Sequence, residues 1–322
     1  MKLNRMAFAA AVLAASGAVS AQTVSPQQAI INQSGSNDTA TIDQTGTAVA
    51  NITQAGGSSN TASILQSQNG VAGFNAFATV TQTGTTGANA QVHQFGTTGT
   101  TGVTVTQQYG TGSTMDVLQF EGAGNQINGL QQGSTNNATL QQAGGTTGSL
   151  IRQTQYGNGN TAWVVQGNPS GGGSASQARS WQTGDNNTAY TGQGNGTNNS
   201  SYVAQGVNTM PGSYYADQAG GWVAVDTTVF PTYTSGSTAN LQQDGGSNNI
   251  GYIIQYGSNQ YAYVSQGGAD NTGGILQTGA SNQATLFQTG IGGHAAISQR
   301  GTGAYGYVSQ SGAGNTASVT QR

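Results

Sequence analysis

The sequence predicts an all-β fold, a β-solenoid of short stacked strands, and three observations lead to this prediction. Near the C-terminus glutamines recur at a strict interval of eleven residues, aliphatic residues keep a fixed offset from them, and charged residues make up only 5% of the chain. A fixed period with a constant internal pattern is the sequence signature of a repeat protein. We expect about 12 turns of about 22 residues each, with two strands per turn.

The regular glutamines have the same neighbours in every unit. An aliphatic residue stands two positions before each, Gly or Ala stands four before, and Gly stands two after wherever the chain continues. These offsets share one parity, so in an extended strand the three side chains point to one face, whereas a helix needs apolar spacing near 3.6. We therefore expect a ladder in which each glutamine amide bonds its equivalents above and below. The ladder residues are Gln255, Gln266, Gln277, Gln288, Gln299, Gln310 and Gln321.

Clusters of Gly, Asn and Asp separate the predicted strands. Such residues supply the positive φ angles that tight turns require, as in Gly314-Asn315 and Asp185-Asn186-Asn187. Asparagines at equivalent positions, Asn160, Asn282 and Asn315, are expected to add amide stacking to the glutamine ladder.

The N-terminus has the features of a secretory signal. Lys2 and Arg5 precede an apolar run, and the small-residue site Val19-Ser20-Ala21 follows it. Residues 1–21 are therefore predicted to be a signal peptide, cleaved after Ala21, so that the mature chain leaves the cytoplasm.

The rest of the chain divides into two parts. Residues 22–30 are expected to form a short leader, and residues 31–322 the solenoid. The interval between glutamines widens in three places, which predicts irregular insertions near residues 67–81, 167–181 and 219–240. One unit has two candidate anchors, Gln153 and Gln155, and the spacing leaves both open.

The charge balance excludes one large class of partner. Six Lys and Arg residues stand against nine Asp and Glu residues, and removal of the signal takes away two of the six basic ones. A nucleic-acid-binding surface needs a basic patch, so nucleic acid is not an expected partner. Low charge instead suits strands that stack on copies of themselves, because like charges would otherwise accumulate along each ladder.

Catalytic chemistry is not predicted. The two histidines, His93 and His294, stand at outward positions, where solvent exposure is the simplest interpretation. Asp38, Asp185 and Asp270 are interpreted as charged residues that limit self-association. No cluster of acids, bases or metal ligands suggests an enzyme, a cofactor or a metal site.

A longer motif repeats in phase with the glutamines. The spacing Gln-x-Gly-x-Gly-Asn-x-Ala-x-x-x-Gln occurs twice, from Gln155 to Gln166 and from Gln310 to Gln321, and nearer the middle of the chain it recurs in partial form. This motif resembles the curlin repeat of curli amyloid subunits.

The resemblance implies an extracellular functional amyloid of bacterial biofilms, exported through a dedicated outer-membrane pore. The segments Gln28-Ala29-Ile30-Ile31 and Val319-Thr320-Gln321-Arg322 are similar to the minor, nucleating subunit, so both the filament-subunit and the nucleator roles stay open. The expected partners are copies of the chain itself, a major or nucleating curlin subunit, and the secretion pore.

The favoured function is therefore a secreted structural subunit of a curli-like fimbria that supports biofilm matrix and cell adhesion. The alternative is a monomeric β-solenoid, such as a surface or ice-binding adhesin, which would need a flat outward array of threonines. The outward residues three positions before the regular glutamines show no such array: Tyr252, Tyr263, Gly274, Thr285, Ala296, Tyr307 and Ser318.

Overall fold

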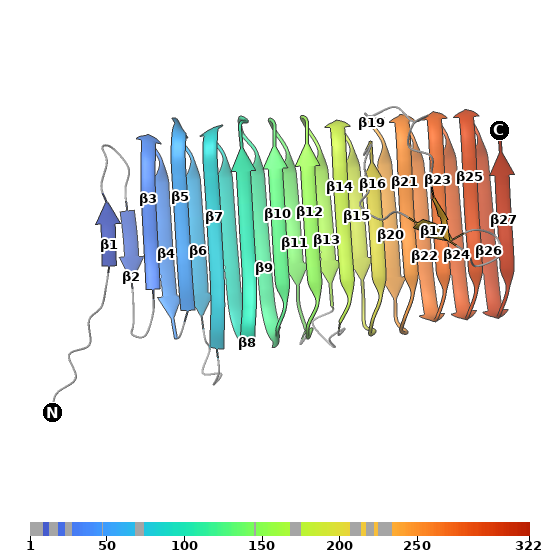
Figure 1. Cartoon of the computed structure of the whole chain (residues 1–322), viewed down its shortest axis with the longest axis horizontal. Helices are drawn as coiled ribbons and strands as arrows, with labels where there is room; N and C mark the ends of the chain where they lie inside the picture. The colour runs from blue at the N-terminus through green and yellow to red at the C-terminus, as the bar shows by residue number, and fades with distance from the viewer. Residues whose placement is uncertain are drawn as a thin grey trace.

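A computed structural model describes most of the chain. The described residues are 9–12, 19–22, 28–46, 48–67, 74–144, 146–167, 175–206, 214–216, 222–224 and 234–322. In these residues two long parallel sheets, here called sheet A and sheet B, stack strand upon strand along one axis (Figure 1). The predicted all-β solenoid with two strands per turn is confirmed.

Successive strands alternate between the two sheets. Sheet A contains β1 (Ala9–Val12), β3 (Gln28–Ser36), β5 (Ala48–Ser58), β7 (Phe74–Thr86), the second part of β8 (Asn89–Gln108), β10 (Gln126–Gln132), β12 (Leu150–Tyr156), β14 (Gln177–Asp185), β16 (Ser200–Gln205), β19 (Thr234–Ser235), β21 (Ile250–Ser258), β23 (Thr272–Ala280), β25 (His294–Thr302) and β27 (Thr316–Gln321).

Sheet B contains β2 (Val19–Gln22), β4 (Thr39–Thr45), β6 (Thr61–Ser67), the first part of β8, β9 (Thr114–Ala123), β11 (Asn137–Gln142), β13 (Thr161–Gln166), β15 (Thr188–Gln193), β20 (Thr238–Asp244), β22 (Tyr261–Ala269), β24 (Gln283–Ile291) and β26 (Tyr305–Ala313).

Each strand pairs in register with the equivalent strand of the next turn. In sheet A, Ile253 lies against Ile275 and Gln255 against Gln277, and the same register holds in sheet B. Parallel pairing without a slip keeps each side chain on the face that its parity assigns. The residues at offsets −4, −2 and 0 therefore point between the two sheets.

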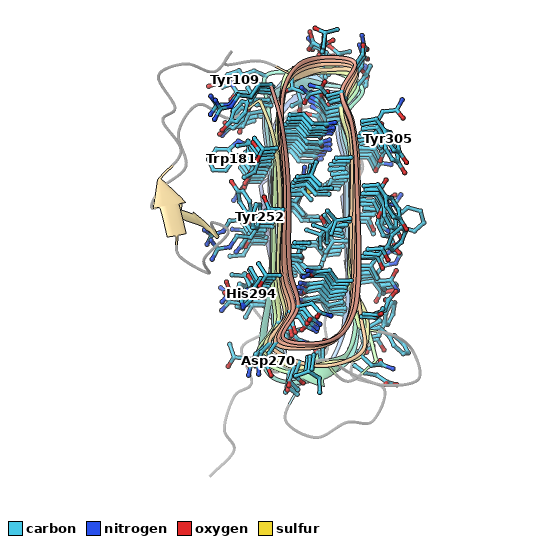
Figure 2. The ribbon with its side chains drawn as sticks, turned by 90° about the vertical axis from the view of Figure 1, so that its right-hand side faces the viewer. Tyr109, Trp181, Tyr252, Asp270, His294 and Tyr305 are labelled. Atoms are coloured by element: carbon cyan, nitrogen blue, oxygen red, sulfur yellow. The ribbon has the colours of Figure 1, made fainter. Side chains whose placement is uncertain are left out.

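The space between the sheets is a narrow, continuous core. Figure 2 looks along the stack and shows the turns superimposed as a flattened ring, with side chains aligned inside it and outside it. The inward aliphatic residues of the regular units, such as Ile253, Val264 and Ile275, are fully buried. Apolar burial and backbone pairing thus act together along the whole axis.

Stacking also explains the glycine two residues after each regular glutamine. Gly257 and Gly279 have φ angles of 117° and 106°, which L-residues rarely adopt. A Cβ on Gly257 would lie 1.8 Å from the carbonyl oxygen of Gly279 in the next turn. Only glycine at this position therefore allows successive turns to lie as close together as hydrogen-bonded strands do.

Strands of the stack extend into the three ranges in which irregular insertions were predicted. β7 begins at Phe74, β14 at Gln177 and β20 at Thr238, each inside a range predicted to be irregular. These strand residues stack on the preceding turn because their parity and apolar positions match it, for example Val80 on Ile52. Residues 68–73 and 168–174 lie outside the described residues.

The third predicted insertion, near residues 219–240, includes a strand outside the stack. β18 (Trp222–Ala224) forms a separate antiparallel pair with β17 (Tyr214–Ala216). The solenoid passes directly from β16 to β21 in sheet A, so Gln205 pairs with Gln255.

An apolar cluster on the outer face of sheet A was not predicted. Tyr252, Ile254 and Tyr256 point outward by parity, yet they are 8%, 0% and 1% exposed. Figure 2 shows the β17–β18 pair beside this face, where Tyr252 and Trp181 are labelled. Burial raises the pKa of the Tyr252 hydroxyl to about 12.

The predicted signal region also contains strands. β1 pairs with β3 and β2 pairs with β4, so these residues extend the stack at its N-terminal end. Cleavage after Ala21 stays a prediction.

Candidate functional site: stacked amide ladders and the terminal strands

The predicted glutamines form two separate ladders. Gln255, Gln277, Gln299 and Gln321 belong to sheet A, and Gln266, Gln288 and Gln310 belong to sheet B. The side-chain nitrogen of each glutamine donates to the side-chain oxygen of the glutamine one turn later. The distance is 2.9 Å from Gln255 to Gln277 and 3.1 Å from Gln288 to Gln310.

Both ladders run through the whole solenoid. The sheet A ladder begins at Gln33 and the sheet B ladder at Gln44, and each step joins Nε2 to Oε1 at 2.6–3.1 Å. The ladder crosses the third insertion without a break, because Gln205 donates to Gln255 at 2.8 Å and Gln193 to Gln243 at 2.9 Å. Buried amides chained in this way satisfy each other in a site that excludes water.

Each of the seven regular glutamines, from Gln255 to Gln321, also links the two sheets, which the sequence did not reveal. Gln277 Nε2 donates to the carbonyl of Tyr261 at 3.0 Å, and Gln299 Nε2 donates to that of Gln283 at 2.9 Å. The acceptor is the first residue of the preceding strand in the opposite sheet. The glutamine side chain is long enough to reach this carbonyl while it keeps its ladder bond, so it connects the two sheets at the edge of the core.

Asparagines form a second kind of ladder at the turns. The backbone nitrogen of Asn160 donates to Asn136 Oδ1 at 3.0 Å, and Asn160 Oδ1 accepts from the backbone nitrogen of Asn187 at 2.9 Å. Its Nδ2 donates to the carbonyl of Gly184 at 2.6 Å. One side chain therefore makes backbone bonds to the next turn.

The other two predicted asparagines occupy opposite turns. Asn282 lies in the same column as Asn160, where it accepts from the backbone nitrogen of Ala304 at 2.9 Å and donates to the Gly301 carbonyl at 3.1 Å. Asn315 lies at the other turn and is exposed, with its Nδ2 bonded to the carbonyl of Ser311 at 2.5 Å.

Asp38 occupies an asparagine position, which corrects its interpretation as a surface charge. It is 3% exposed, and its Oδ1 accepts from the backbone and side-chain nitrogens of Asn60 at 2.9 and 3.0 Å. Its Oδ2 is buried without a hydrogen-bond partner among the described residues. Asp185 at the end of β14 and Asp270 directly after β22 are exposed.

The hydrogen bonds of the ladder decide between the two candidate anchors, Gln153 and Gln155. Gln155 is the ladder member, because its Nε2 donates to Gln182 Oε1 at 2.9 Å. Gln153 takes the place of the core aliphatic residue and is 1% exposed, and neither of its side-chain polar atoms has a partner in the described part of the chain.

The last strands of the stack leave one edge unpaired within the chain. β27 pairs with β25 and β26 pairs with β24, each on one side only in the described structure. Val319 and Gln321 are half-buried, whereas their equivalents one turn earlier, Ile297 and Gln299, are fully buried. An edge with this register is a template for a further strand.

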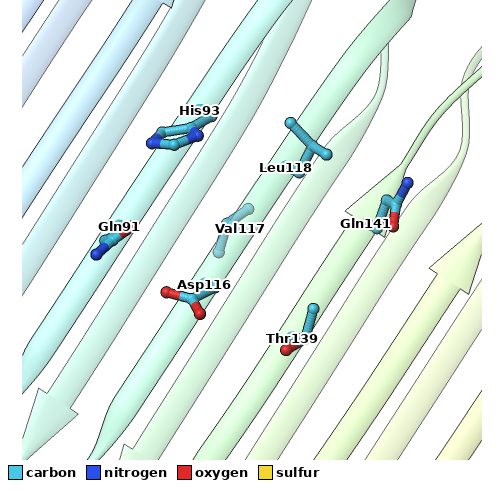
Figure 3. Close-up of a pocket in the computed structure, with 7 residues that line it drawn as sticks. All are labelled: Gln91, His93, Asp116, Val117, Leu118, Thr139 and Gln141. Atoms are coloured by element: carbon cyan, nitrogen blue, oxygen red, sulfur yellow. The ribbon is translucent and has the colours of Figure 1, made fainter.

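A shallow hollow on the outer face of sheet B contains one of the two histidines. Figure 3 shows it across β8, β9 and β11, with His93 and Asp116 on adjacent strands. Partial burial raises the pKa of the Asp116 carboxyl, and His93 lowers it. Groups of three or more His, Cys, Asp or Glu side chains able to hold a metal ion do not occur in the described residues.

These features define a class of protein: a parallel β-solenoid whose turns are linked by stacked glutamine and asparagine amides. The family model of the curlin associated repeat matches residues 268–301 and 294–322, which span the most regular turns. The resemblance of these C-terminal turns to the curlin repeat is therefore confirmed. No curated protein matches its sequence. Among the described residues no helix is long and apolar enough to cross a membrane.

Proposed function

We propose that the chain is a structural subunit that polymerises end to end into an extracellular, curli-like amyloid fibre. The observation that carries the proposal is the pair of unbroken glutamine ladders. Every turn offers the next the same backbone groups and ladder amides, and the C-terminal turns add an aliphatic residue at a fixed position, so a strand of a second copy fits where a strand of the same chain would.

The terminal strands give this proposal its geometry. The outer edge of β26 and β27 presents unpaired backbone groups together with Gln310 and Gln321, whose positions continue the two ladders. β27 contains no charged residue that would repel an added strand. Cleavage after Ala21 would remove β1 and most of β2 from the N-terminal edge. The first repeat strands of another copy could then supply matching glutamines, Gln33 and Gln44.

The direct test is the transition of residues 22–322 from soluble protein to fibres. We expect fibres whose diffraction shows a meridional spacing of about 4.7–4.8 Å, the distance between strands along the axis. Protein that stays monomeric at micromolar concentration would contradict polymerisation and favour a monomeric binding solenoid.

Two neighbouring substitutions test the role of the ladder. Gln321→Leu removes an inward amide at the terminal strand, and Thr320→Leu places the same residue at the adjacent outward position. We expect a longer lag time for Gln321→Leu than for Thr320→Leu, measured by a fibre-binding dye. Equal lag times would contradict templating by the ladder.

The predicted signal peptide also leads us to propose that the chain is exported before it polymerises. We propose that the chain reaches the cell surface through an outer-membrane pore and there contributes to biofilm matrix and adhesion, either as the filament subunit or as its nucleator. Intact-mass analysis of secreted protein is expected to show Gln22 as the first residue. Retention of Met1 would contradict cleavage after Ala21.

An ice-binding solenoid is less well supported. A column of outward threonines does occur on sheet B, including Thr39, Thr61 and Thr161, but Asn89 and Asn137 interrupt it. Its neighbouring column is mixed, so the face is not a flat two-dimensional threonine array.

A further inference from the structure

Seven aromatic side chains gather on the outer face of sheet B. They are Trp163, Tyr190, Tyr261, Tyr263, Phe287, Tyr305 and Tyr307. Figure 2 places Tyr305 on the side of the ring opposite Tyr252 and His294. Tyr305 and Tyr307 are 62% and 51% exposed, and the strands that carry the seven residues contain no charged residue. The intervening strand β20 ends at the exposed Asp244, whose negative charge acts on Tyr190. A suitable ligand of this face therefore carries no negative charge and offers apolar surface.

Three tyrosines of this face lie in one column at a regular interval. The pairing of the strands stacks Tyr190, Asn240, Tyr263, Thr285 and Tyr307 in that order. Tyrosine thus alternates with an amide or a hydroxyl. Neighbouring strands lie about 4.8 Å apart, so the rings recur about every 10 Å along the axis. In the adjacent column Tyr261, Gln283 and Tyr305 follow the same alternation.

Other aromatic residues hold these tyrosines in place. Trp163 packs edge-on against Tyr190 with ring centroids 5.7 Å apart. Phe287 lies between Tyr263 and Tyr307, at 5.4 Å and 6.1 Å from their ring centroids. Rings that are fixed before binding lose little entropy when a ligand arrives.

We propose that this face binds a neutral, extended β-1,4-linked polysaccharide that lies parallel to the solenoid axis. The repeat of such a chain is one disaccharide, whose length is close to two turns of the solenoid. Every second sugar can then place its CH-rich face on a tyrosine ring. The contact buries the apolar surface of the ring, and the tyrosine hydroxyl stays available for a hydrogen bond. Asn240 and Thr285 lie level with the sugars between, whose hydroxyl groups require hydrogen-bond partners.

The same features argue against a second copy of the chain as the occupant. A stable interface between proteins buries on the order of 800 Å² per partner around an apolar centre. Here the two tyrosine columns carry a polar side chain at every second turn, such as Asn240 and Thr285. The interruption suits a polymer with a two-turn repeat better than a continuous protein surface.

The test measures the retention of freshly prepared soluble protein, residues 22–322, on microcrystalline cellulose, with starch granules as an α-linked comparison. The variant Tyr190→Thr, Tyr263→Thr, Tyr307→Thr removes the ring column and keeps residues that favour strands. We expect cellulose binding by the parent and an affinity at least about tenfold lower for the variant, because truncated aromatic anchors commonly lose that much each. Starch is expected to bind weakly to both proteins.

A matched control removes three exposed aromatic residues away from the tyrosine column, with Phe77→Thr, Tyr109→Asn and Phe120→Thr. Asparagine is used at position 109 because it tolerates the φ angle of 48° found there better than threonine does. This variant is expected to bind cellulose as the parent does, and circular dichroism checks that both variants fold. The proposal is overturned if the parent does not bind cellulose, if both variants lose binding equally, or if starch binds as well as cellulose.

Sedimentation of the parent without glycan tests the alternative occupant, which is a second copy of the chain. Tyrosine-dependent dimers would assign the face to a second copy and overturn the polysaccharide site. Because soluble protein is used and fibre formation is not the readout, the polysaccharide site and the proposed polymer succeed or fail independently.

Discussion

The C-terminal turns and the middle turns of the solenoid share one backbone register but differ in their cores. From β20 to β26, every position two residues before the ladder glutamine is a fully or largely buried aliphatic residue, such as Leu241, Ile275 and Leu286. From β10 to β16 the same positions include Gly129, Gln153, Ser180 and Thr191. The apolar core is accordingly divided into two clusters, which meet between Ala178 and Ala189.

The middle turns keep their register although their core is partly polar. Gln153, Ser180 and Thr191 bury side-chain polar atoms that have no partner in the described structure. Across the same turns the ladder from Gln155 through Gln182 to Gln205 continues at 2.9 and 3.0 Å. The amide ladder and the backbone pairing therefore set the register, and the aliphatic core adds stability to it. We expect the middle turns to open first.

The largest expected effect comes from placing a middle-type core residue in the C-terminal turns. Ile275→Ser removes a fully buried side chain and leaves a buried hydroxyl. We expect the free energy of unfolding to fall by about 3–5 kcal/mol. Urea denaturation of the soluble protein measures it, with the half-buried outward Ala296→Ser as a control that should change little. A small loss for Ile275→Ser would contradict the importance of the aliphatic core in these turns.

Removing one ladder amide should be nearly as costly. Gln277→Leu leaves Gln255 Nε2 and Gln299 Oε1 without their ladder partner and frees the carbonyl of Tyr261. We expect a loss of about 2–4 kcal/mol, because buried polar groups lose their partners. The outward Leu276→Gln serves as the comparison. If Gln277→Leu lowered the free energy of unfolding no more than Leu276→Gln does, the conclusion that the ladder sets the register would be contradicted.

The junction of the two regions should be sensitive to alkaline pH. Tyr252 on β21 pairs in register with Tyr202 of β16, and burial raises the pKa of the Tyr252 hydroxyl to about 12, against 10.0 for an exposed tyrosine. The neutral form is favoured in the fold, so this stability is fully present below pH 10 and is lost as the pH rises from 10 to about 12. The loss is about 2–3 kcal/mol. Unfolding midpoints measured across this range should fall less for Tyr252→Phe than for the parent.

The reverse exchange should stabilise the middle turns. Gln153→Leu replaces a buried amide that has no partner with an aliphatic residue of similar size. We expect the free energy of unfolding to rise by about 1–3 kcal/mol. Hydrogen exchange should show the gain in β10 to β14 and not in β22 to β26. A destabilised variant would indicate that the amide is satisfied by a bound water or by another group.

The smallest expected effect concerns the first member of the asparagine column. Asp38→Asn supplies an Nδ2 that can donate to the carbonyl of Gly57 in the next turn, as Asn160 does to Gly184. We expect a gain of about 1 kcal/mol, confined to β4 and β6. Asp270→Asn, in an exposed turn, is the control and should be near neutral. Equal gains would point to net charge as the cause.

The fold could be predicted because its signals are local and repeated. Parity assigned Ile253 and Gln255 to the inner face, and the eleven-residue period assigned the stacking of Gln255, Gln277 and Gln299. The predicted ladder glutamines all lie in ladders, but their division between two sheets and their bonds to opposite carbonyls required the closed turn. The outward tyrosines were recognised, while their alternation in one column was not, because it depends on which strands become neighbours.

The sequence by itself determined the strand period, the inward face and the glycine turns, since each follows from residues within one eleven-residue unit. Tertiary structure decided where the chain departs from the repeat. It placed Gln153 inside the core, Asp38 in an asparagine column, and β17 and β18 outside the stack. Pairing Gln205 with Gln255 joins residues fifty positions apart. The physical reason is that hydrogen bonding between turns selects the register that satisfies the whole ladder, and no single unit contains that information.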